Sequence, residues 1–498
     1  MNVKFGLEAI IRINRSKFIV YLLLVPFTVS LLSCEKEITE PRENQPPSTT
    51  IFNIPVDNDT IFALFTFEWD GGDPDGYIAG FEYRYSTYHV NQGDSTHQPW
   101  QFTPETKETI AFDSKDILNK QFFEVRAVDD KGAVDPTPAT KQFYTSQATP
   151  PEVQIQAPAN NAKMFAVNEV TDWWNGVRFS FTGSDDDGEI VEYLWKVDSG
   201  EWVYTTDTTF ILTPDDFDAP LEGKHTLYVN AVDNTNIQHP SGDSVSITLV
   251  VPDFTRDLLI IDETDESAFP SSASVKDSTV DRFYAELFGT DVSWDYYEND
   301  LRGKPLPPLD SLGQYKVVVW HADNRPSTNP HYISEHVDVL QDYMNVGGSF
   351  VMSGWRILKS FAWREDFPVT FPSESFVAKY LHIMRADETP YIPGDFIGAD
   401  GVGDFSDVAV DSTKLATFPF NGKLSNINIV LTRAGFTEEL YRYQNLQASS
   451  LYQYRGRACG LKYLGTKFNA VILGFPLFFL KQEDAKLLAQ DILETMGL

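Results

Sequence analysis

Polar residues that could do chemistry follow three apolar stretches in the second half of the chain. The stretch Leu258–Ile261 precedes a run of acidic residues, Lys316–Trp320 precedes a histidine, and Ser349–Met352 precedes a serine. Carboxylates, an imidazole and a guanidinium brought together could bind a sugar or an anion, or hold a divalent cation. The candidate ligand-binding residues are Asp262, Glu263, Asp265, His321, Asp323, Ser353, Trp355 and Arg356.

The cation set and its alternative use different residues. A divalent cation such as Ca²⁺ would take oxygen and nitrogen ligands from Asp262, Asp265, His321 and Asp323. The alternative is a group of solvated loops whose charges pair with Arg325 and Arg356. From these residues alone we assign no catalytic residue, no resident metal and no cofactor.

These residues need elements that bring them together. From Asp257 onward, apolar strands alternate with helical stretches. We predict strands over 258–261, 292–297, 316–320, 349–352 and 470–475, helices over 279–287, 333–344 and 482–496, and a long insertion over 361–464. Buried strands separated by helices indicate a parallel sheet with helices on both faces. Because ligands of open α/β sheets bind beyond the carboxyl ends of the strands, the polar residues should meet at one edge.

The order of these elements resembles the flavodoxin-like fold of class I glutamine amidotransferase-like domains, including the trehalose-utilisation (ThuA-like) branch. The resemblance implies a cysteine nucleophile on a sharp turn after a strand, and a His-Pro-Glu stretch after a late strand. Here Ser353 falls near the nucleophile position, while Phe475 and Leu477 stand where the histidine and the glutamate should be. A serine without a positioned base is a poor nucleophile. We therefore expect no glutaminase activity from residues 253–498.

Two stretches in the first half of the chain repeat each other. Residues 73–85 and 185–197 share the pattern Asp-x-Asp-Gly-x-Ile, and residues 123–130 match residues 227–234. The first pair is offset by 112 residues and the second by 104, and a repeat of about 100 residues corresponds to one β-sandwich domain. The repeats resemble bacterial immunoglobulin-like domains of the fibronectin type III kind.

Aspartates and tryptophans in the repeats have two interpretations each. We expect Asp73, Asp75, Asp185 and Asp187 to cap turns through bonds to the backbone, with Ca²⁺ binding as the alternative. We expect Trp173, Trp174 and Trp202 to pack in cores or over strand faces, with sugar stacking as the alternative.

The first 33 residues are typical of an export signal. Basic residues precede an uncharged apolar run of 15 residues, 18–32, which is short for a spanning helix of about 20 residues. The run ends in Leu31-Leu32-Ser33-Cys34, which resembles the lipobox of bacterial lipoproteins. The resemblance implies cleavage before Cys34 and its acylation, which would anchor the protein in a membrane. The alternative is a plain secretory signal with an incidental cysteine.

Residues 34–49 are rich in charge and proline, which predicts a solvated tether. Glu35-Lys36-Glu37, directly after the cysteine, resembles the export signals of surface lipoproteins in the Bacteroidetes group. The resemblance implies an outer-membrane lipoprotein displayed on the cell surface. An anchor that faces the periplasm is the alternative.

The composition excludes whole classes of protein. Of 498 residues, 42% are hydrophobic, which is enough for several packed cores. The net charge of −33 repels phosphate backbones and excludes nucleic acid as a partner. Two cysteines, Cys34 and Cys459, cannot build a disulfide framework, and we expect Cys459 to be a small core residue in a strand.

The sequence therefore predicts a multidomain protein with two all-β immunoglobulin-like sandwiches followed by an α/β flavodoxin-like three-layer domain. The predicted segments are a signal peptide over 1–33, a tether over 34–49, sandwiches over 50–149 and 150–252, and the α/β domain over 253–498. We expect a non-catalytic surface protein that binds a glycan or a protein outside the cell. One alternative is a surface hydrolase that uses Asp262 and His321, and another is a purely structural or adhesive protein. A pocket closed by the 361–464 insertion would favour binding or catalysis, and a sheet edge filled by aromatic residues would favour a structural role.

Overall fold

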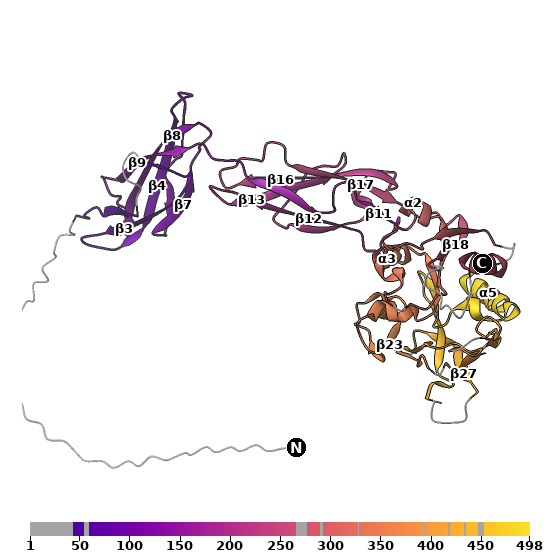
Figure 1. Ribbon diagram of the computed structural model, residues 1–498. Coiled ribbons are helices and arrows are strands. Elements are labelled where there is room, and N and C mark those ends of the chain that lie inside the picture. The colour runs from indigo at the N-terminus through magenta and orange to yellow at the C-terminus, as the bar shows by residue number, and fades with distance from the viewer. Residues whose placement is uncertain are drawn as a thin grey trace, which may run out of the picture.

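The computed structural model describes residues 43–53, 59–264, 276–288, 292–326, 328–392, 394–416, 419–432, 435–446 and 453–498. The predicted signal peptide, Cys34 and the candidate ligand residue Asp265 lie outside the described residues. The described chain is mostly β-structure. It forms two β-sandwiches in a row and a larger body of sheet and helices at the C-terminal end (Figure 1).

The first sandwich packs two sheets face to face. Among the described residues, the smaller sheet has the order β1 (Ser48–Phe52), β3 (Leu64–Gly72), β7 (Lys107–Ala111). The larger sheet has the order β2 (Thr60–Ile61), β9 (Ala139–Ser146), β8 (Leu118–Asp129), β4 (Ile78–His89), β5 (Ser95–His97), with β6 (Gln101–Thr103) paired to β4. Burial alternates along most of β8, as in a strand with one face on a core. Phe67 and Trp69 stack on Phe123 in that core.

The second sandwich repeats this plan. One sheet has the order β10 (Glu152–Ala157), β12 (Val177–Ser184), β15 (Thr209–Leu212), and η1 (Pro214–Asp216) follows β15. The other has the order β11 (Lys163–Phe165), β17 (Asp243–Val250), β16 (Gly223–Asp233), β13 (Ile190–Val197), β14 (Val203–Thr205). The strands that follow the two Asp-x-Asp-Gly motifs, β4 and β13, pair antiparallel with β8 and β16. The repeated sequence motifs therefore lie on matched pairs of strands.

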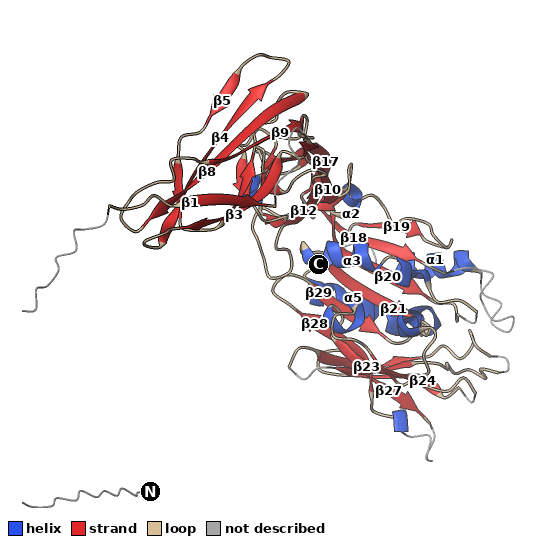
Figure 2. Cartoon of the chain, turned by 90° about the vertical axis from the view of Figure 1, so that its left-hand side faces the viewer, coloured by secondary structure: helices blue, strands red, loops and turns tan. Residues whose placement is uncertain are grey.

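The C-terminal body is built on one long mixed sheet. Its parallel part has the order β19 (Trp294–Glu298), β18 (Arg256–Asp262), β20 (Tyr315–Ala322), β21 (Ser349–Gly354), β29 (Asn469–Leu473). Its antiparallel part continues with β28 (Ala458–Leu464), β27 (Glu438–Asn445), β24 (Phe396–Gly401), β25 (Val408–Ala409). Figure 2 shows helices beside this sheet. The apolar runs form the central parallel strands because these strands are buried on both faces.

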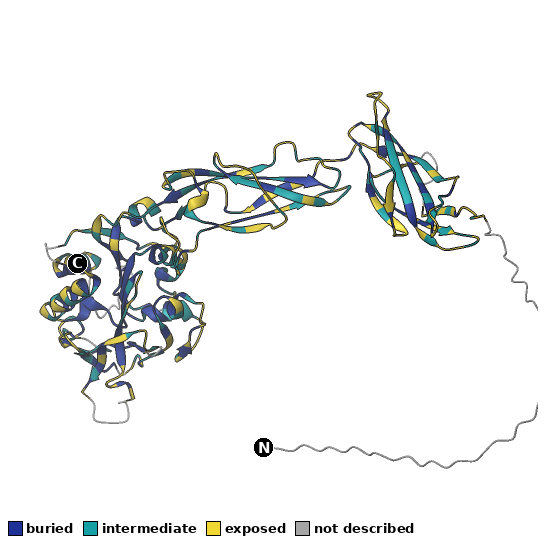
Figure 3. Cartoon of the chain, turned by 180° about the vertical axis from the view of Figure 1, so that it is seen from behind, coloured by how far each residue is buried: buried dark blue, intermediate teal, exposed yellow. Residues whose placement is uncertain are grey.

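Helices cover both faces of the sheet. Buried residues of α1 (Asp277–Leu287) and α5 (Gln482–Met496) share one core, and those of α3 (Val337–Asn345) belong to the core on the other face. The strands between them are largely buried (Figure 3). The remaining short elements are α2 (Leu309–Leu312), η3 (Tyr332–Glu335), η4 (Ile357–Ala362), α4 (Phe376–Lys379), η6 (Leu477–Phe479), and a small sheet of β22 (Val369–Thr370), β23 (Ile383–Glu388), β26 (Asn428–Thr432).

Two sequence expectations for this body need correction. Most of the predicted 361–464 insertion is not a separate unit, because β24, β25, β27 and β28 extend the main sheet. The helix predicted over 333–344 is split: the chain forms the 3-10 turn η3, and α3 begins only at Val337. The reason lies in Glu263, whose carboxylate accepts the N–H groups of Tyr332 and Ile333 and so fixes a separate short turn.

Candidate functional site

Strands β18 and β20 bring Asp262, His321 and Asp323 together at the carboxyl end of the sheet. Asp262 is the last residue of β18 and lies in register with His321. The imidazole Nδ1 of His321 is 3.0 Å from an Asp323 oxygen and 3.3 Å from an Asp262 oxygen. Each of the three side chains is 0% exposed. The structure thus brings these three candidate residues together at a place that solvent does not reach.

Two tyrosines complete this group, which we call the edge cluster: Asp262, His321, Asp323, Tyr284 and Tyr296. The Tyr284 ring stacks on the imidazole with centroids 3.5 Å apart, and its hydroxyl donates to Asp323 at 2.9 Å. The Tyr296 hydroxyl donates to Asp262. Sequence reasoning missed both tyrosines, because a tyrosine on a mostly apolar helix face or edge strand is typical of ordinary packing. The position of Tyr296 near the carboxyl end of β19 was the one available signal.

The electrostatics of the edge cluster favour a charged imidazole. Burial lowers the pKa of His321, but the Asp262 charge and the hydrogen bond to Asp323 raise it, and the net shift is upward. Burial and the Asp323 charge raise the pKa of Tyr284 well above its usual value. The surroundings of His321 therefore favour the charged form of its imidazole, and the hydroxyls of Tyr284 and Tyr296 serve as hydrogen-bond donors to the neighbouring carboxylates.

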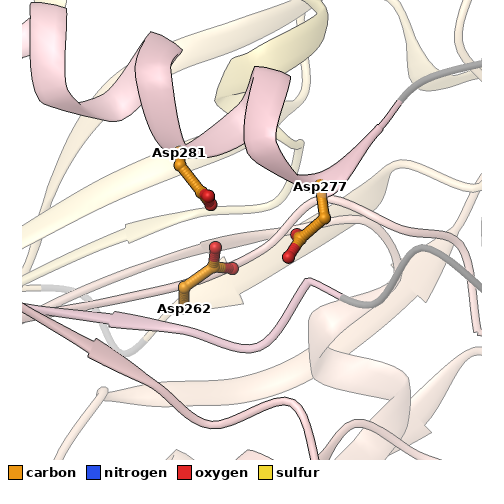
Figure 4. A group of neighbouring side chains, drawn as sticks. All are labelled: Asp262, Asp277 and Asp281. Carbon is orange, nitrogen blue, oxygen red and sulfur yellow. The ribbon is translucent and has the colours of Figure 1, made fainter.

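Two carboxylates at the start of α1, those of Asp277 and Asp281, lie beside Asp262 of the edge cluster (Figure 4). Asp262, Asp277 and Asp281 each place one oxygen within 4.8 Å of the others. Clustered carboxylates are ligands that hard divalent cations favour. This set shares only Asp262 with the cation set predicted from the sequence. In the structure the Tyr296 hydroxyl donates to both Asp262 and Asp281, so a tyrosine links two of the three carboxylates.

Glu263 has a structural task and is not free to bind a ligand. Its carboxylate accepts the indole N–H of Trp320 at 2.9 Å and the backbone N–H of Ile333 at 3.1 Å. It also accepts the N–H of Tyr332, and His331 Nδ1 lies 3.5 Å away. The side chain is buried. The placement of Glu263 among the ligand-binding candidates is therefore corrected: its lone pairs stabilise the start of η3.

Ser353 lies inside strand β21 and not on the turn that follows it. Its side chain is buried, and its hydroxyl donates to the carbonyl oxygen of Phe475 at 3.1 Å. The left-handed residue between β21 and η4 is Arg356, with φ of 61°. A strained strand-to-helix turn is where α/β hydrolases carry their nucleophile. In this chain the residue at that turn is Arg356. Ser353, which the sequence placed near the nucleophile position, lies three residues before the turn.

Trp355 belongs to the core. Its ring packs on Phe420 and Phe479 with centroids 5.4 and 5.1 Å apart, and its indole N–H donates to the Ser425 carbonyl at 2.7 Å. The side chain is 0% exposed. Trp355 therefore cannot stack on a ligand, and its assignment as a ligand-binding residue is corrected. Together with Tyr284 and Tyr296, it shows that aromatic side chains fill this part of the sheet edge.

Arg356 and Arg325 do not pair with the carboxylates of the edge cluster. Arg356 Nε donates to Glu388 at 2.8 Å, and its Nη1 donates to the Pro326 carbonyl at 3.2 Å. Arg325 Nε donates to the Asn426 side chain at 2.8 Å. The described acidic groups Asp262, Glu263 and Asp323 do not form solvated loops paired with these two arginines, because all three are buried and bonded to other groups.

In the sandwiches, the aspartates cap turns as expected. Asp73 accepts the N–H of Asp75 at 3.2 Å, and Asp185 accepts the N–H of Asp187 at 3.3 Å. The bonds that Asp75 and Asp187 accept join each loop to the segment that enters its sandwich.

The tryptophans differ in their environments. Trp174 is buried and donates its indole N–H to the Phe165 carbonyl at 3.1 Å. Trp173 packs against Phe468 of the C-terminal body, with ring centroids 4.8 Å apart. Trp202 is 40% exposed, and the Lys196 ammonium lies 5.2 Å from its ring centroid.

Comparisons with known proteins give matches among solved structures. No family model and no curated protein matches the chain. Among solved structures, the chain is similar to the fibronectin(III)-like modules of Clostridium thermocellum CbhA, at 19% identity and a TM-score of 0.19, over 41% of this chain and 95% of that one. It is similar to the FN1–FN3 domains of chicken CNTN1, at 13% identity and a TM-score of 0.16, over 41% and 66% of the two chains. It is also similar to a bacterial ice-binding adhesin, at 10% identity and a TM-score of 0.19, over 45% and 74%.

Two further observations concern anchoring and thiol chemistry. None of the helices in the described part of the chain combines the length and the hydropathy needed to cross a bilayer.

Cys459, in β28, is buried, and burial raises the pKa of its thiol well above the usual value. A thiol that stays protonated in a core is a poor nucleophile.

Proposed function

We propose that this protein is an acylated lipoprotein of the outer membrane, displayed on the cell surface, in which two immunoglobulin-like sandwiches carry a degenerate amidotransferase-like domain. The C-terminal domain is a binding or scaffold module and not an enzyme. Its partner is a glycan or a protein outside the cell. The anchor is acylated Cys34, and the sandwiches act as a stalk.

Strand order supports a flavodoxin-like core for the C-terminal domain. Numbered along the chain, the parallel strands β18, β19, β20, β21 and β29 lie in the order 2-1-3-4-5. That order is the flavodoxin-like variant of the doubly wound α/β fold. Helices α1 and α5 on one face and α3 on the other agree with a three-layer arrangement. The antiparallel strands beyond β29 are an extension of that core.

One observation carries the non-catalytic assignment: among the residues that the structure describes, the positions after β21 and β29 where this fold would carry a nucleophile and a base hold neither in accessible form. The strained turn after β21 holds Arg356, and Ser353 is buried with its hydroxyl bonded to Phe475. Phe475 is itself buried in the core where a catalytic histidine would stand. A buried serine hydroxyl without a base retains almost none of the rate that a nucleophile–base pair supplies.

The rival hydrolase would act through Asp262 and His321. Both side chains are fully buried, and the imidazole Nδ1 faces two carboxylates under a stacked tyrosine ring. Substrate could reach His321 only if Tyr284 moved away. The buried cluster therefore favours a structural role for this pair over catalysis.

The anchoring part of the proposal is tested with Cys34→Ser. We predict that this variant moves from the membrane fraction to the soluble fraction and loses labelling by radioactive palmitate, because the thiol is the site of acylation. The measurement is fractionation of cells that express the parent or the variant, followed by partition into detergent.

The matched control is Cys459→Ser, which changes the other cysteine of the sequence and should leave membrane retention and labelling intact. Retention of Cys34→Ser in the membrane fraction, with label still incorporated, would show that the lipoprotein assignment is wrong. Accessibility to protease in intact cells separates surface display from a periplasm-facing anchor.

A further inference from the structure

Two arginines lie at the carboxyl edge of the sheet, outside the edge cluster. Arg325 follows strand β20, and Arg356 occupies the turn after the neighbouring strand β21. Both residues are partly exposed, whereas the edge cluster beside them is sealed. In open α/β sheets, this rim is where ligands bind. The two arginines are therefore charged groups of this rim that a ligand can reach.

Side chains hold the two guanidiniums in fixed positions. Arg356 Nε donates to one oxygen of Glu388 at 2.8 Å, and Asn426 Nδ2 donates to the other oxygen at 2.8 Å. The same Asn426 side chain accepts from Arg325 Nε at 2.8 Å, so one chain of bonds joins both arginines. The Arg325 guanidinium also lies 4.1 Å above the Tyr391 ring. The two guanidiniums are therefore preorganised, because packing and hydrogen bonds restrain both long side chains.

Two residues of this network have backbones that L-amino acids rarely adopt. Arg356 has φ of 61° and Asn426 has φ of 51°. For arginine the left-handed region is unusual and costs on the order of 1 kcal/mol or more. Strained residues gather where a side chain must be presented in a defined direction. Here the two left-handed residues are both members of the chain of bonds that joins Arg356, Glu388, Asn426 and Arg325.

The network has more positive charge than its own acid can neutralise. The carboxylate of Glu388, whose side chain is only 10% exposed, binds Arg356 directly and is linked to Arg325 only through Asn426. Burial, and then the charge of Arg356, lower the pKa of Arg325, as expected for two cations held close together. Among the described residues, the terminal Nη atoms of Arg325 have no recorded hydrogen-bond acceptor. The network therefore carries one uncompensated positive charge with free donors.

Two residues adjacent in sequence to members of this network have buried polar atoms without a partner among the described residues. The side-chain oxygen of Asn324, next to Arg325, is buried without a hydrogen-bond partner in the described chain. The hydroxyl of Ser425, next to Asn426, is likewise buried without a partner there. Buried polar atoms in folded proteins are nearly always bonded, to protein, water or ligand. Their position beside the arginines is consistent with a small polar site.

We propose that Arg325 and Arg356 form a binding site for a single carboxylate group of an extracellular ligand. The planar fork of a guanidinium matches a carboxylate, and one negative charge balances the one excess positive charge. A dianion such as phosphate carries one negative charge more than the two guanidiniums and Glu388 together can balance. The inference rests on the proposed binding role of the C-terminal domain and names the chemistry of its ligand.

The test measures binding of two monocarboxylates to the full chain in detergent by calorimetric titration at constant ionic strength. D-glucuronate represents an acidic sugar, N-acetylglycine represents a peptide terminus, and D-glucose has the shape of the first without its charge. We expect saturable binding of at least one carboxylate and none of glucose. Tighter binding of glucuronate would identify the ligand as an acidic sugar, and tighter binding of N-acetylglycine would identify it as a peptide terminus.

Variants then assign the binding to this site. Arg325→Gln leaves the Arg356–Glu388 pair intact and should weaken binding at least about tenfold, as loss of a charge-assisted pair does. Arg385→Gln removes an exposed arginine of β23 and should change nothing. Glu388→Gln removes the competing carboxylate and should tighten binding severalfold. Circular dichroism of each variant checks that the fold is retained.

Three results would overturn the inference. They are the absence of saturable binding of either carboxylate, equal binding by the parent and Arg325→Gln, and, in a parallel titration with inorganic sulfate, tighter binding of sulfate than of both carboxylates. None of these results bears on the membrane anchor, which the Cys34 variant tests separately. Failure of this site and failure of the proposed anchoring are therefore distinguishable.

Discussion

Single residues at the sheet edge illustrate how burial decides what a polar group can do. Asp262, His321 and Asp323 have the residue types of a catalytic site, but they lie under tyrosine rings and bond to one another. Removing one partner of a buried, hydrogen-bonded charge group costs about 3–5 kcal/mol, because the remaining charge is left uncompensated. Their role in the described structure is to join β18, β20 and α1.

Glu298, the last residue of β19, gives this acidic region a dependence on pH. Burial raises its pKa from 4.5 to about 7, and repulsion from Asp262 and Asp281 adds to the effect. Because the pKa is higher in the folded state, folding takes up a proton between these two values. The resulting stability is fully present below pH 4.5 and is lost as the pH rises through about 7.

We predict that Glu298→Gln is more stable than the parent at pH 8 and nearly equal to it at pH 5. The amide removes a charge that the folded protein tolerates poorly, which should raise Tm at pH 8 by about 2–4 °C, or about 1 kcal/mol. Thermal unfolding of both proteins between pH 5 and pH 8 measures the difference.

The control for Glu298→Gln is Glu286→Gln, which removes an exposed negative charge from α1. It separates the local effect from the general benefit of lowering the net negative charge. A Tm difference between Glu298→Gln and the parent that stays the same across the whole pH range would contradict the prediction.

The Asp-x-Asp-Gly loop of each sandwich bonds to the segment of chain that enters that sandwich. In the first sandwich the N–H of Gln45 donates to Asp75 at 3.2 Å. In the second, the N–H and the hydroxyl of Thr149 donate to Asp187 at 3.0 and 2.5 Å. Two prolines follow both Gln45 and Thr149, and proline restricts the backbone direction. The repeated motif therefore fixes the path of the chain into each sandwich, in addition to capping its own turn.

We predict that Asp187→Ala loosens the junction between the sandwiches without unfolding either one. The variant loses the bonds to Thr149, each worth about 1 kcal/mol, while the cores stay intact. Small-angle X-ray scattering should show a broader distribution of maximum dimensions for the variant than for the parent.

Asp186→Ala is the control for this junction, since Asp186 lies in the same loop and is exposed. The proposed role of the loop fails if Asp187→Ala and Asp186→Ala scatter identically to the parent.

For the whole molecule, the second sandwich and the C-terminal body behave as one packed unit. The Trp173 ring lies 4.8 Å from Phe468 and 5.4 Å from Tyr380, measured between ring centroids. A single hydrophobic cluster runs from Phe165 in the sandwich into the core beneath α3. Lys163 and Asp310 add an exposed ion pair across the same boundary. The sequence boundary at residue 252 therefore does not separate two independent cores.

We predict that residues 150–252, expressed alone, unfold at a lower temperature than the same sandwich within the full chain. The isolated fragment exposes Trp173 and Phe165, and it loses about 25 cal/mol for each Å² of apolar surface that the boundary buries. The melting temperature of residues 43–149 should fall far less when this fragment is isolated. Circular dichroism melting of both fragments and the full chain makes the comparison.

An equal melting temperature for residues 150–252 in both settings would contradict the shared core. The repeated motifs predict two separate sandwiches, over 50–149 and 150–252. The difference arises from β11 and the segment around Trp173, whose apolar residues pack on a neighbour that no repeat predicts.

Local patterns predicted the elements well wherever burial is periodic or continuous. The apolar runs at 258–261, 316–320 and 349–352 form β18, β20 and β21, and the amphipathic stretch at 482–496 forms α5. The paired motifs predicted β-structure on both sides of the Asp-Gly turns. The lipobox at Cys34 remains a prediction, because it lies outside the described residues. These features depend on residues that are close in sequence, so they can be recognised from a single sequence.

The candidate site was predicted less completely, because its properties depend on residues distant in sequence. The sequence by itself placed Asp262, His321 and Asp323 at one sheet edge, since parallel strands end together. Only the tertiary structure decided that Tyr284 and Tyr296 seal these groups, that Glu263 caps η3, and that Trp355 lies in the core. The physical reason is that accessibility and hydrogen-bond partners are set by packing between elements, and residue type and spacing do not specify that packing.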